Sequence, residues 1–297
     1  MAKLSVGGQA VIEGVMMRGP KDVATAVRDP NGRIQVETHP VSSIADRYPI
    51  LKKPMLRGTV SLVESLVLGL RSLSYSAKMA GDEDEQLTDK EMAGTIIFAL
   101  VLASILFIAI PTGAAKFFHF ITDDPVFLNL MEGFLRLAIF LAYIGGISRM
   151  KDIRRVFQYH GAEHKTIFCY EAGLPLTVEN VRVQPRHHPR CGTSFLFVVI
   201  FVSILISSVV FGIWPITNAL LRTAVHLLLL PMVVGITYEF NRWVGRHVQD
   251  SGLAKVLTAP GMWMQNFTTN EPDDSMIECA IRSLELVLPS EEGKDEW

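Results

Sequence analysis

The chain has 297 residues, with 28 basic and 30 acidic side chains, a formal net charge of −2 and a positive mean hydropathy. Its length alone allows one or two soluble domains. Because the charge is nearly balanced and the chain contains no phosphate-binding loop and no basic–aromatic pattern, we expect no nucleic-acid partner.

The N-terminal region, residues 1–54, begins with a small predicted β unit over residues 1–40. The run GGQAVIEGVMMRGP is rich in glycine, which indicates tight turns or close approach of the backbone. Whether its Glu13 and Arg18 act there or pair with each other is open. Further on, the sequence DPNG at residues 29–32 separates two strand-like runs. It predicts a β-hairpin, because proline presets φ and Asn-Gly accepts a positive φ.

Residues 55–92 combine an amphipathic helix with an acidic linker. Over residues 55–80, four leucines recur at helical spacing, with charged residues between them. These leucines are Leu62, Leu66, Leu70 and Leu73. The helix is expected to lie on a membrane surface or to pack on the cytoplasmic part of the protein. The run GDEDEQLTDKE at residues 81–91 is expected to be a solvated linker.

Four apolar stretches predict a bundle of transmembrane helices. They cover residues 93–112, 126–147, 195–214 and 216–236. The first and third carry no charge and are each about 20 residues long, enough for a helix to cross a hydrocarbon layer of about 30 Å. The other two are long enough but carry ionisable residues. Charge-free runs of this length are rare in soluble proteins, so we interpret regions 93–147 and 195–236 as two pairs of spans.

The distribution of Lys and Arg predicts how these spans are oriented. The segment between the second and third spans, residues 148–194, is rich in basic residues, namely Arg149, Lys151, Arg154, Arg155, Lys165, Arg182, Arg186 and Arg190. The link between the first two spans has only Lys116, and the link between the last two has none. Because positively charged loops stay in the cytoplasm, we expect this segment and both termini to be cytoplasmic. The three cysteines then lie on the reducing side, and no disulfide is expected.

The second and fourth spans carry matched ionisable residues. Glu132 and Arg222 are each roughly 9 Å from the outer end of their span, and Arg136 and His226 are each roughly 15 Å deep. These matched depths predict two polar layers that join the two helices. We favour an adhesive role between helices over a polar path for an ion or small solute.

Residues 152–171 are predicted to form a helix that carries His160, Glu163 and His164 on one face. The two histidines are one turn apart, so their side chains can converge on one ion. Downstream, the run QPRHHPRCGTSF adds His188 and Cys191 at a ligand-like spacing, just before the third span.

The first interpretation of this region, 148–194, is a catalytic metal site. His160 and His164 would bind zinc, and Glu163 would act as the general base, because H-x-x-E-H is the inverted form of the zinc-peptidase motif. The third ligand would come from one of three residues, His188, Cys191 or Glu239. Bound zinc lowers the pKa of its water to about 7, and a nearby carboxylate accepts the proton.

Two other interpretations are open. In one, a structural site is closed by four protein ligands, namely His160, His164, His188 and Cys191, with Glu163 hydrogen-bonded to a ligand. In the other there is no metal, and these groups bond to one another or to a ligand. A fourth protein ligand such as Cys191 would close the position that a reacting water needs, which argues against catalysis.

The C-terminal region, residues 237–297, predicts a short terminal helix. Ser275 followed by Glu278 has the pattern of a capping box, and apolar residues then recur on one face from Ile277 to Val287. We expect this helix to dock on the cytoplasmic part of the protein.

Five segments together resemble the YqhQ family of bacterial membrane proteins, a family of unknown function. They are GGQAVIEGVMMRGP, YHGAEHKTI, HPRCGTSF, YEFNR and PGMWMQNFTTNEPDD. The resemblance implies a protein of the bacterial inner membrane and carries the description of a predicted metal-dependent enzyme, without a substrate. The matching positions are His160, Glu163, His164, His188, Cys191, Glu239 and Arg242.

The sequence therefore predicts a membrane α-helical fold: a four-helix transmembrane bundle with a small cytoplasmic α+β unit that includes an N-terminal β-hairpin. Its leading functional interpretation is a Zn²⁺-dependent hydrolase at the cytoplasmic membrane surface. That location favours a lipid-linked or membrane-peptide substrate in the lipid bilayer. The rival is a non-enzymatic scaffold or transporter with a structural Cys/His site, and either is compatible with an oligomer.

Overall fold

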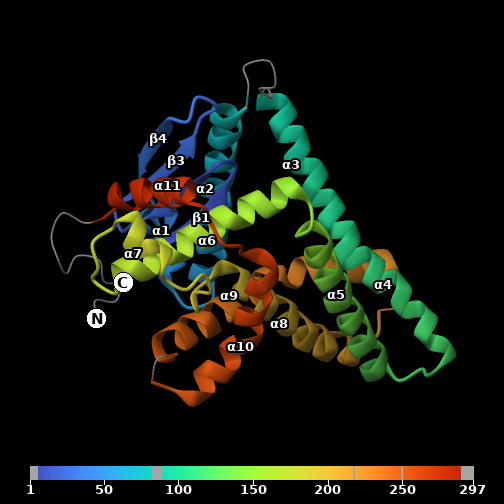
Figure 1. Ribbon diagram of the computed structural model, residues 1–297. Helices are drawn as coiled ribbons and strands as arrows, with labels where there is room; N and C mark the ends of the chain where they lie inside the picture. The colour runs from blue at the N-terminus through green and yellow to red at the C-terminus, as the bar shows by residue number, and fades with distance from the viewer. Residues whose placement is uncertain (1–5, 82–88, 217, 249, 289–297) are drawn as a thin grey trace.

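The computed structural model describes residues 6–81, 89–216, 218–248 and 250–288. Its chain forms two parts that lie side by side (Figure 1). One is an α/β unit built from a four-stranded sheet and the helices on its two faces. The other is a bundle of four long apolar helices, which we call the apolar bundle. The acidic linker expected at residues 81–91 falls largely outside the described residues.

The sheet is an antiparallel meander in the order β1-β2-β3-β4. Its strands are β1 (Gly7–Val11), β2 (Gly14–Arg18), β3 (Asp22–Arg28) and β4 (Ile34–Pro40). The predicted hairpin is confirmed between β3 and β4, where Asp29 Oδ1 accepts the backbone N–H of both Asn31 and Arg33 at 2.9 Å. Gly32 adopts φ 79° in this turn. The glycine-rich run before it, which the sequence placed in the same small β unit without assigning its strands, forms β1 and β2.

Helices cover both faces of the sheet. On one face, α6 (Lys151–Glu171) and α11 (Asp274–Glu285) enclose a fully buried core with the inward side chains of β2 and β3. Core members from the sheet are Val15, Met17 and Ala24, and those from the helices include Tyr159, Ala162, Met276, Ile277, Ala280 and Leu284. Burial of this apolar surface is the main stabilising term of the α/β unit.

The other face of the sheet packs against α2 (Leu56–Ala80), the predicted amphipathic helix. Small residues make this contact: Thr25 Oγ1 donates to Ser72 Oγ at 2.9 Å, and the Ile12 N–H donates to Ser76 Oγ at 3.3 Å. Of the predicted leucine stripe, Leu62, Leu70 and Leu73 are half-buried, whereas Leu66 is 54% exposed and its neighbour Val67 is 61% exposed. An apolar stripe of α2 is therefore uncovered.

The terminal helix α11 docks as predicted, but its start differs. Asp273 is its N-cap and accepts the Met276 N–H at 3.0 Å, whereas the predicted capping residue Ser275 donates its hydroxyl to Asp273. Glu278, the predicted partner in the capping box, bonds Arg28 of β3 instead. An aspartate two residues earlier therefore outcompetes the serine for the helix N-terminus.

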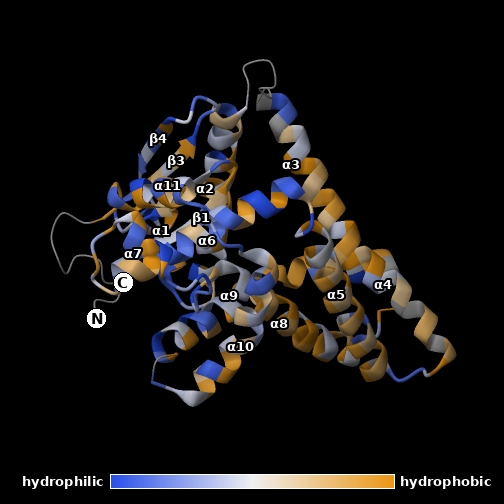
Figure 2. Ribbon diagram, in the orientation of Figure 1, coloured by the Kyte–Doolittle hydropathy of each residue, from blue (hydrophilic) through white to orange (hydrophobic). Residues whose placement is uncertain are grey.

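Four helices are long and apolar enough to cross a membrane, over Ala93–Ala114, Val126–Ile147, Gly192–Ile213 and Leu220–His247. In Figure 2 the ribbons of these helices are predominantly in the colour of hydrophobic residues, whereas the α/β unit is mixed. The elements that contain them are α3 (Asp89–Ser104), η3 (Ile105–Ala109), α4 (Ile110–Ala114), α5 (Pro125–Ile147), α8 (Gly192–Ile213) and α9 (Ala219–His247). The shorter elements are α1 (Ile44–Arg47), η1 (Pro49–Lys52), η4 (Ala115–Phe120), α7 (Val178–Arg182) and α10 (Gly252–Thr268).

The ionisable residues of the second and fourth apolar helices meet in one network rather than in two layers. Glu132 Oε2 accepts from Arg222 Nε at 2.8 Å, while Glu132 Oε1 lies 3.0 Å from Arg136 Nη2 and 2.9 Å from His226 Nε2. The hydroxyl of Thr112 in α4 donates to the same carboxylate at 2.9 Å. All four partners are buried or nearly so, and they join α4, α5 and α9 around one carboxylate.

The close packing of α6 against the chain after α10 gives a testable prediction. A Cβ added at Gly161 would lie 2.0 Å from the carbonyl oxygen of Asn270, whose N–H already bonds the Phe157 carbonyl at 2.8 Å. We expect Gly161→Ala to lower the free energy of unfolding of the α/β unit by about 1–3 kcal/mol, because this backbone contact must open. Thermal unfolding followed by circular dichroism measures it. Gly252→Ala, at a helix start with open space around it, should change stability by less than about 1 kcal/mol.

Candidate metal centre

The predicted helix, α6, places His160 and His164 beside the start of α8. His160 and His164 lie one turn apart in α6, and their rings contact each other with centroids 4.4 Å apart. Cys191 is the N-cap of α8, and its Sγ lies 3.2 Å from His160 Nε2. One ligand atom from each of these three residues lies within 4.8 Å of the other two. The structure thus brings together three of the residues that the sequence singled out.

Backbone carbonyls orient both imidazoles. His160 Nδ1 lies 2.7 Å from the Thr268 carbonyl oxygen, and His164 Nδ1 lies 2.6 Å from the Arg186 carbonyl oxygen. A carbonyl only accepts hydrogen bonds, so each Nδ1 carries a proton, and Nε2 is the ring nitrogen left to bind an ion. This is the arrangement found around most metal-binding histidines, in which the second ring nitrogen donates to a carbonyl or carboxylate.

The protonation states of the group also suit metal binding. Burial lowers the pKa of His164, which favours its neutral form. Burial on its own would raise the pKa of the Cys191 thiol, but hydrogen bonds with His164 and Thr193 outweigh it and leave that pKa below its ordinary value. Neutral imidazole and thiolate are the forms that bind metal ions.

Glu163 is enclosed between α6 and strand β1. Its side chain meets Gly8, where an added Cβ would lie 2.8 Å from the carboxyl carbon, and the Gly8 N–H bonds this carboxylate. Its Oε2 is buried and has no hydrogen-bond partner among the residues that the structure describes. Burial raises the pKa of Glu163 to about 7, partly opposed by the nearby His160. One oxygen of this carboxylate is thus held by the sheet and the other is unpaired.

His188 is buried beside the group but does not join it. Its ring lies between those of His164 and Phe168, with centroid separations of 5.7 Å and 4.5 Å. Its Nε2 is 3.5 Å from a carboxylate oxygen of Glu171, and Gln265 bonds its backbone N–H and carbonyl, each at 2.8 Å. Burial lowers the pKa of His188 to about 4. Sequence reasoning missed Gln265, since nothing in a sequence marks an amide that will bond a backbone 77 residues away.

Glu239 is engaged elsewhere. Its carboxylate forms a two-point ion pair with Arg57 of α2, one contact being Arg57 Nε to Oε1 at 2.7 Å, and it also accepts the Met55 N–H at 3.4 Å. This pair fixes the start of α2 against α9. Glu239 is therefore not brought into the group of donor atoms, and the structure gives it a role in helix packing.

The donor set fits a zinc-type ion. Two imidazole nitrogens and one thiolate form a borderline-soft set of the kind that binds Zn²⁺. In a tetrahedral zinc site, neighbouring ligand atoms are about 3.5 Å apart, as follows from bond lengths of about 2.0–2.3 Å. The separation of 3.2 Å between Cys191 Sγ and His160 Nε2 is already close to this value, and all three donor atoms lie within 4.8 Å of one another.

Comparisons with known proteins agree with the family resemblance. The family described as "Protein of unknown function (DUF1385)" matches residues 53–290. The chain is also similar to the "Uncharacterized protein YqhQ" of Bacillus subtilis (strain 168), with 35% identity over 296 residues, covering 95% of this chain and 92% of that protein. No solved structure matches the chain. The predicted resemblance is thus confirmed, and neither description names a metal, a substrate or a reaction.

Proposed function

We propose that this chain, which belongs to the DUF1385 family of proteins of unknown function, is an integral membrane protein with a metal-dependent, hydrolase-like centre at its cytoplasmic surface. The observation that carries the proposal is the convergence of three oriented donor atoms, from His160, His164 and Cys191, beside a buried carboxylate.

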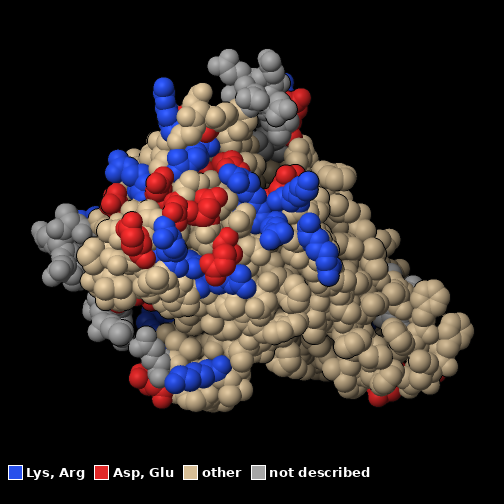
Figure 3. All heavy atoms as spheres, in the orientation of Figure 1, with Lys and Arg blue, Asp and Glu red and all other residues tan. Residues whose placement is uncertain are grey.

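The membrane assignment is supported by the four long apolar helices and by the distribution of charge. In Figure 3, Lys, Arg, Asp and Glu gather over the α/β unit, while the visible face of the apolar bundle is almost free of them. The basic segment 148–194 belongs to α6, α7 and the start of α8. Because such segments stay in the cytoplasm, the α/β unit and both termini are cytoplasmic in this proposal, and the membrane is the bacterial inner membrane.

In this proposal, His160, His164 and Cys191 hold a zinc-type ion. Such an ion acts as a Lewis acid and makes a coordinated water much more acidic than bulk water. The chain contributes the orientation of the ligands through the carbonyls of Thr268 and Arg186. Glu163 offers its unpaired oxygen to receive and hold a proton beside the ligands, while the Gly8 N–H fixes the position of the carboxylate.

The count of protein ligands favours catalysis over a purely structural role. Structural zinc sites are usually closed by four protein ligands, whereas catalytic sites have three and leave a position open. In the described part of the chain, only three Cys, His or acidic residues form the group, because His188 faces Glu171 and Glu239 is paired with Arg57. Cys191 is then the third ligand rather than the fourth, so its presence no longer argues against catalysis.

The position of the centre suggests the class of substrate. Cys191 caps α8, one of the apolar helices, so the donor atoms lie where the bundle meets the α/β unit. In a membrane this junction corresponds to the cytoplasmic interface. A lipid-linked molecule or a membrane peptide is the substrate class that reaches such a site directly.

One observation favours the rival, a non-enzymatic scaffold or transporter with a structural site. Glu163 bonds the Gly8 N–H on the edge strand β1, so its burial has a structural explanation that needs no reaction. The two proposals differ in whether a small ligand can reach the metal.

Cobalt substitution tests this difference without knowledge of a substrate. Full-length protein is purified, its metal is exchanged for Co²⁺, and the visible spectrum is recorded while azide is added. We expect a thiolate-to-cobalt band that Cys191→Ser abolishes, and a spectral change on adding azide, because an open position accepts a small anion. A thiolate band that ignores azide would support the structural site.

Replacing the carboxylate separates the two roles of Glu163. We expect Glu163→Gln to retain one equivalent of metal, measured by mass spectrometry, while failing to complement a strain that lacks the gene. The amide oxygen of glutamine can still accept the Gly8 N–H, but an amide cannot take up a proton at neutral pH. Complementation by Glu163→Gln at the level of the unaltered protein would contradict a hydrolytic role.

A further inference from the structure

A second candidate site lies on the opposite face of strand β1 from Glu163. It is a pocket of about 400 Å³ between the ends of β1 and β2 and the sheet-facing side of α2. Gly7, Gly8, Gln9, Met16, Arg18 and Gly19 line it from the sheet, and Ser61, Ser65 and Leu68 line it from the helix. Its size falls in the range of small-molecule sites. None of these residues belongs to the three-donor group.

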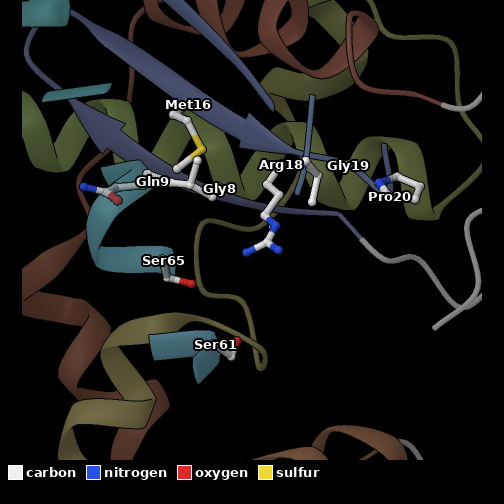
Figure 4. A pocket seen from close by; sticks show the side chains of 11 residues that line it. Gly8, Gln9, Met16, Arg18, Gly19, Pro20, Ser61 and Ser65 are labelled. Carbon is white, nitrogen blue, oxygen red and sulfur yellow. The ribbon is translucent and has the colours of Figure 1, made fainter. Parts of the chain in front are cut away.

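The side chain of Arg18 projects into this pocket, as Figure 4 shows. The sequence left open whether Glu13 and Arg18 pair, and they do not: the Glu13 carboxylate is bound by Arg155 and by the Tyr159 hydroxyl. Among the described residues, no acidic group or hydrogen-bond acceptor contacts the Arg18 guanidinium. Half-buried arginines normally find a partner, because removing their charge from water without one is costly.

Two hydroxyl groups face the same space. Ser61 and Ser65 are one turn apart in α2, and Figure 4 shows both side chains directed to the side on which the Arg18 guanidinium lies. Neither hydroxyl has a hydrogen-bond partner among the described residues. A guanidinium and two hydroxyls offer several donors to one ligand, and a phosphate group has enough acceptor oxygens to receive them.

The charge and the apolar lining of the pocket restrict the chemical class of its ligand further. Arg18 is the one ionisable residue among those that line the pocket, so the pocket neutralises a single negative charge. A phosphodiester carries one negative charge, whereas a phosphate monoester carries between one and two at neutral pH. Met16, Leu68, Val41 and Pro20 supply apolar surface around the cation, which suits an organic substituent on each side of the phosphate.

The location favours an amphiphile. Close to Ser61, the Thr59 hydroxyl donates to the carbonyl of Pro231 in α9 at 3.1 Å, so this wall of the pocket is attached to an apolar helix. The opposite side of α2 exposes Val63, Leu66 and Val67, each more than half exposed. Helix α2 thus offers hydroxyls on one side and uncovered apolar surface on the other, as an interfacial helix does.

We propose that the pocket at Arg18 binds the phosphodiester group of an anionic amphiphile, with Arg18 as counter-ion and Ser61 and Ser65 as hydrogen-bond donors. This site goes beyond the metal centre and does not depend on it, since the three donor residues lie on the other side of β1. The two sites share Gly8, which lines the pocket and contacts Glu163.

Titration of the full-length protein in non-ionic detergent tests the proposal. The probe is dihexanoylphosphatidylglycerol, followed by isothermal titration calorimetry. We expect saturable binding to the unaltered protein and a Kd about tenfold or more higher for Arg18→Gln, since a hydrogen bond to a charged group contributes about 1.5–3 kcal/mol. Arg33→Gln is the matched control, because Arg33 is exposed at the β3–β4 turn, and its Kd should equal that of the unaltered protein.

Titrations with two further ligands show whether the phosphodiester belongs to an amphiphile or to a soluble molecule. Glycerophosphoglycerol has the same head group without acyl chains, and binding as tight as that of the amphiphile would support the phosphodiester site and assign it to a soluble ligand. A preference for inorganic phosphate over both diesters would overturn the proposal, as would an unchanged Kd for Arg18→Gln. Should Arg18→Gln fail to fold, the double variant Ser61→Ala, Ser65→Ala decides: it leaves the charge unaltered and must still raise the Kd.

Discussion

The variant His164→Ala is expected to lose its metal ion. His164 is almost fully buried, its Nδ1 is committed to the Arg186 carbonyl and its Nε2 faces Cys191, so alanine removes one of the three donors. We expect the affinity for Zn²⁺ to fall by more than about 100-fold, because even changes to groups that only support a ligand cost about 10–100-fold. Metal content after purification and competition with a zinc-binding dye measure this.

The matched controls are His188 and Glu239, which the sequence analysis also named as candidate ligands. His188→Ala removes a buried imidazole whose ring contacts that of His164, and Glu239→Gln removes a carboxylate that is paired with Arg57. Both variants should retain one equivalent of metal. Loss of metal in His188→Ala at unchanged stability would show a fourth protein ligand, and the centre would then be a closed structural site. Retention of metal by His164→Ala would refute the proposed centre altogether.

Sequence reasoning located the candidate ligands but not the set that converges. His160 and His164 are related by helical geometry, which a spacing of four residues fixes once the helix is recognised. The choice between His188 and Cys191 depends on where α8 begins. Cys191 caps that helix and accepts the Thr193 N–H, so its sulfur is turned towards the histidines. The spacing of three residues between His188 and Cys191 does not show which of the two side chains has this orientation.

In the fold, too, the features set by local sequence could be predicted, whereas those set by contacts between distant residues could not. Long helices and the DPNG hairpin have strong periodicity or turn signals and were predictable. The β1–β2 hairpin was not, because its turn places Glu13 at φ 51°, where Asn or Gly is the usual signal. Helix α10 contains Pro260 and two glycines, Gly252 and Gly261, which weaken its helical signal. The ion pair that engages Glu239 joins residues 182 apart and depends entirely on tertiary packing.

The polar network inside the apolar bundle gives the other large expected effect. Replacing Glu132 with glutamine should prevent the protein from being recovered as a folded, single species after extraction in detergent. Two guanidiniums, from Arg136 and Arg222, contact this one carboxylate, and glutamine would leave both without a counter-charge. Removing one partner of a buried ion pair costs about 3–5 kcal/mol. Size-exclusion chromatography and thermal unfolding measure the loss.

A second substitution distinguishes adhesion between helices from a polar path. Arg222→Gln leaves the pair of Glu132 and Arg136 in place, so it should reduce stability less than Glu132→Gln. The double variant leaves one guanidinium without its carboxylate, whereas Glu132→Gln alone leaves two. It should therefore recover part of the stability lost in Glu132→Gln, as expected for charges that stabilise each other. Arg222→Gln also removes the contacts of this guanidinium with Asn129 and the Phe211 ring, and that loss is common to the single and the double variant. If Glu132→Gln instead folds as well as the unaltered protein but fails to complement a strain lacking the gene, the carboxylate acts on a solute rather than on helix packing, and the transporter interpretation gains its first direct support.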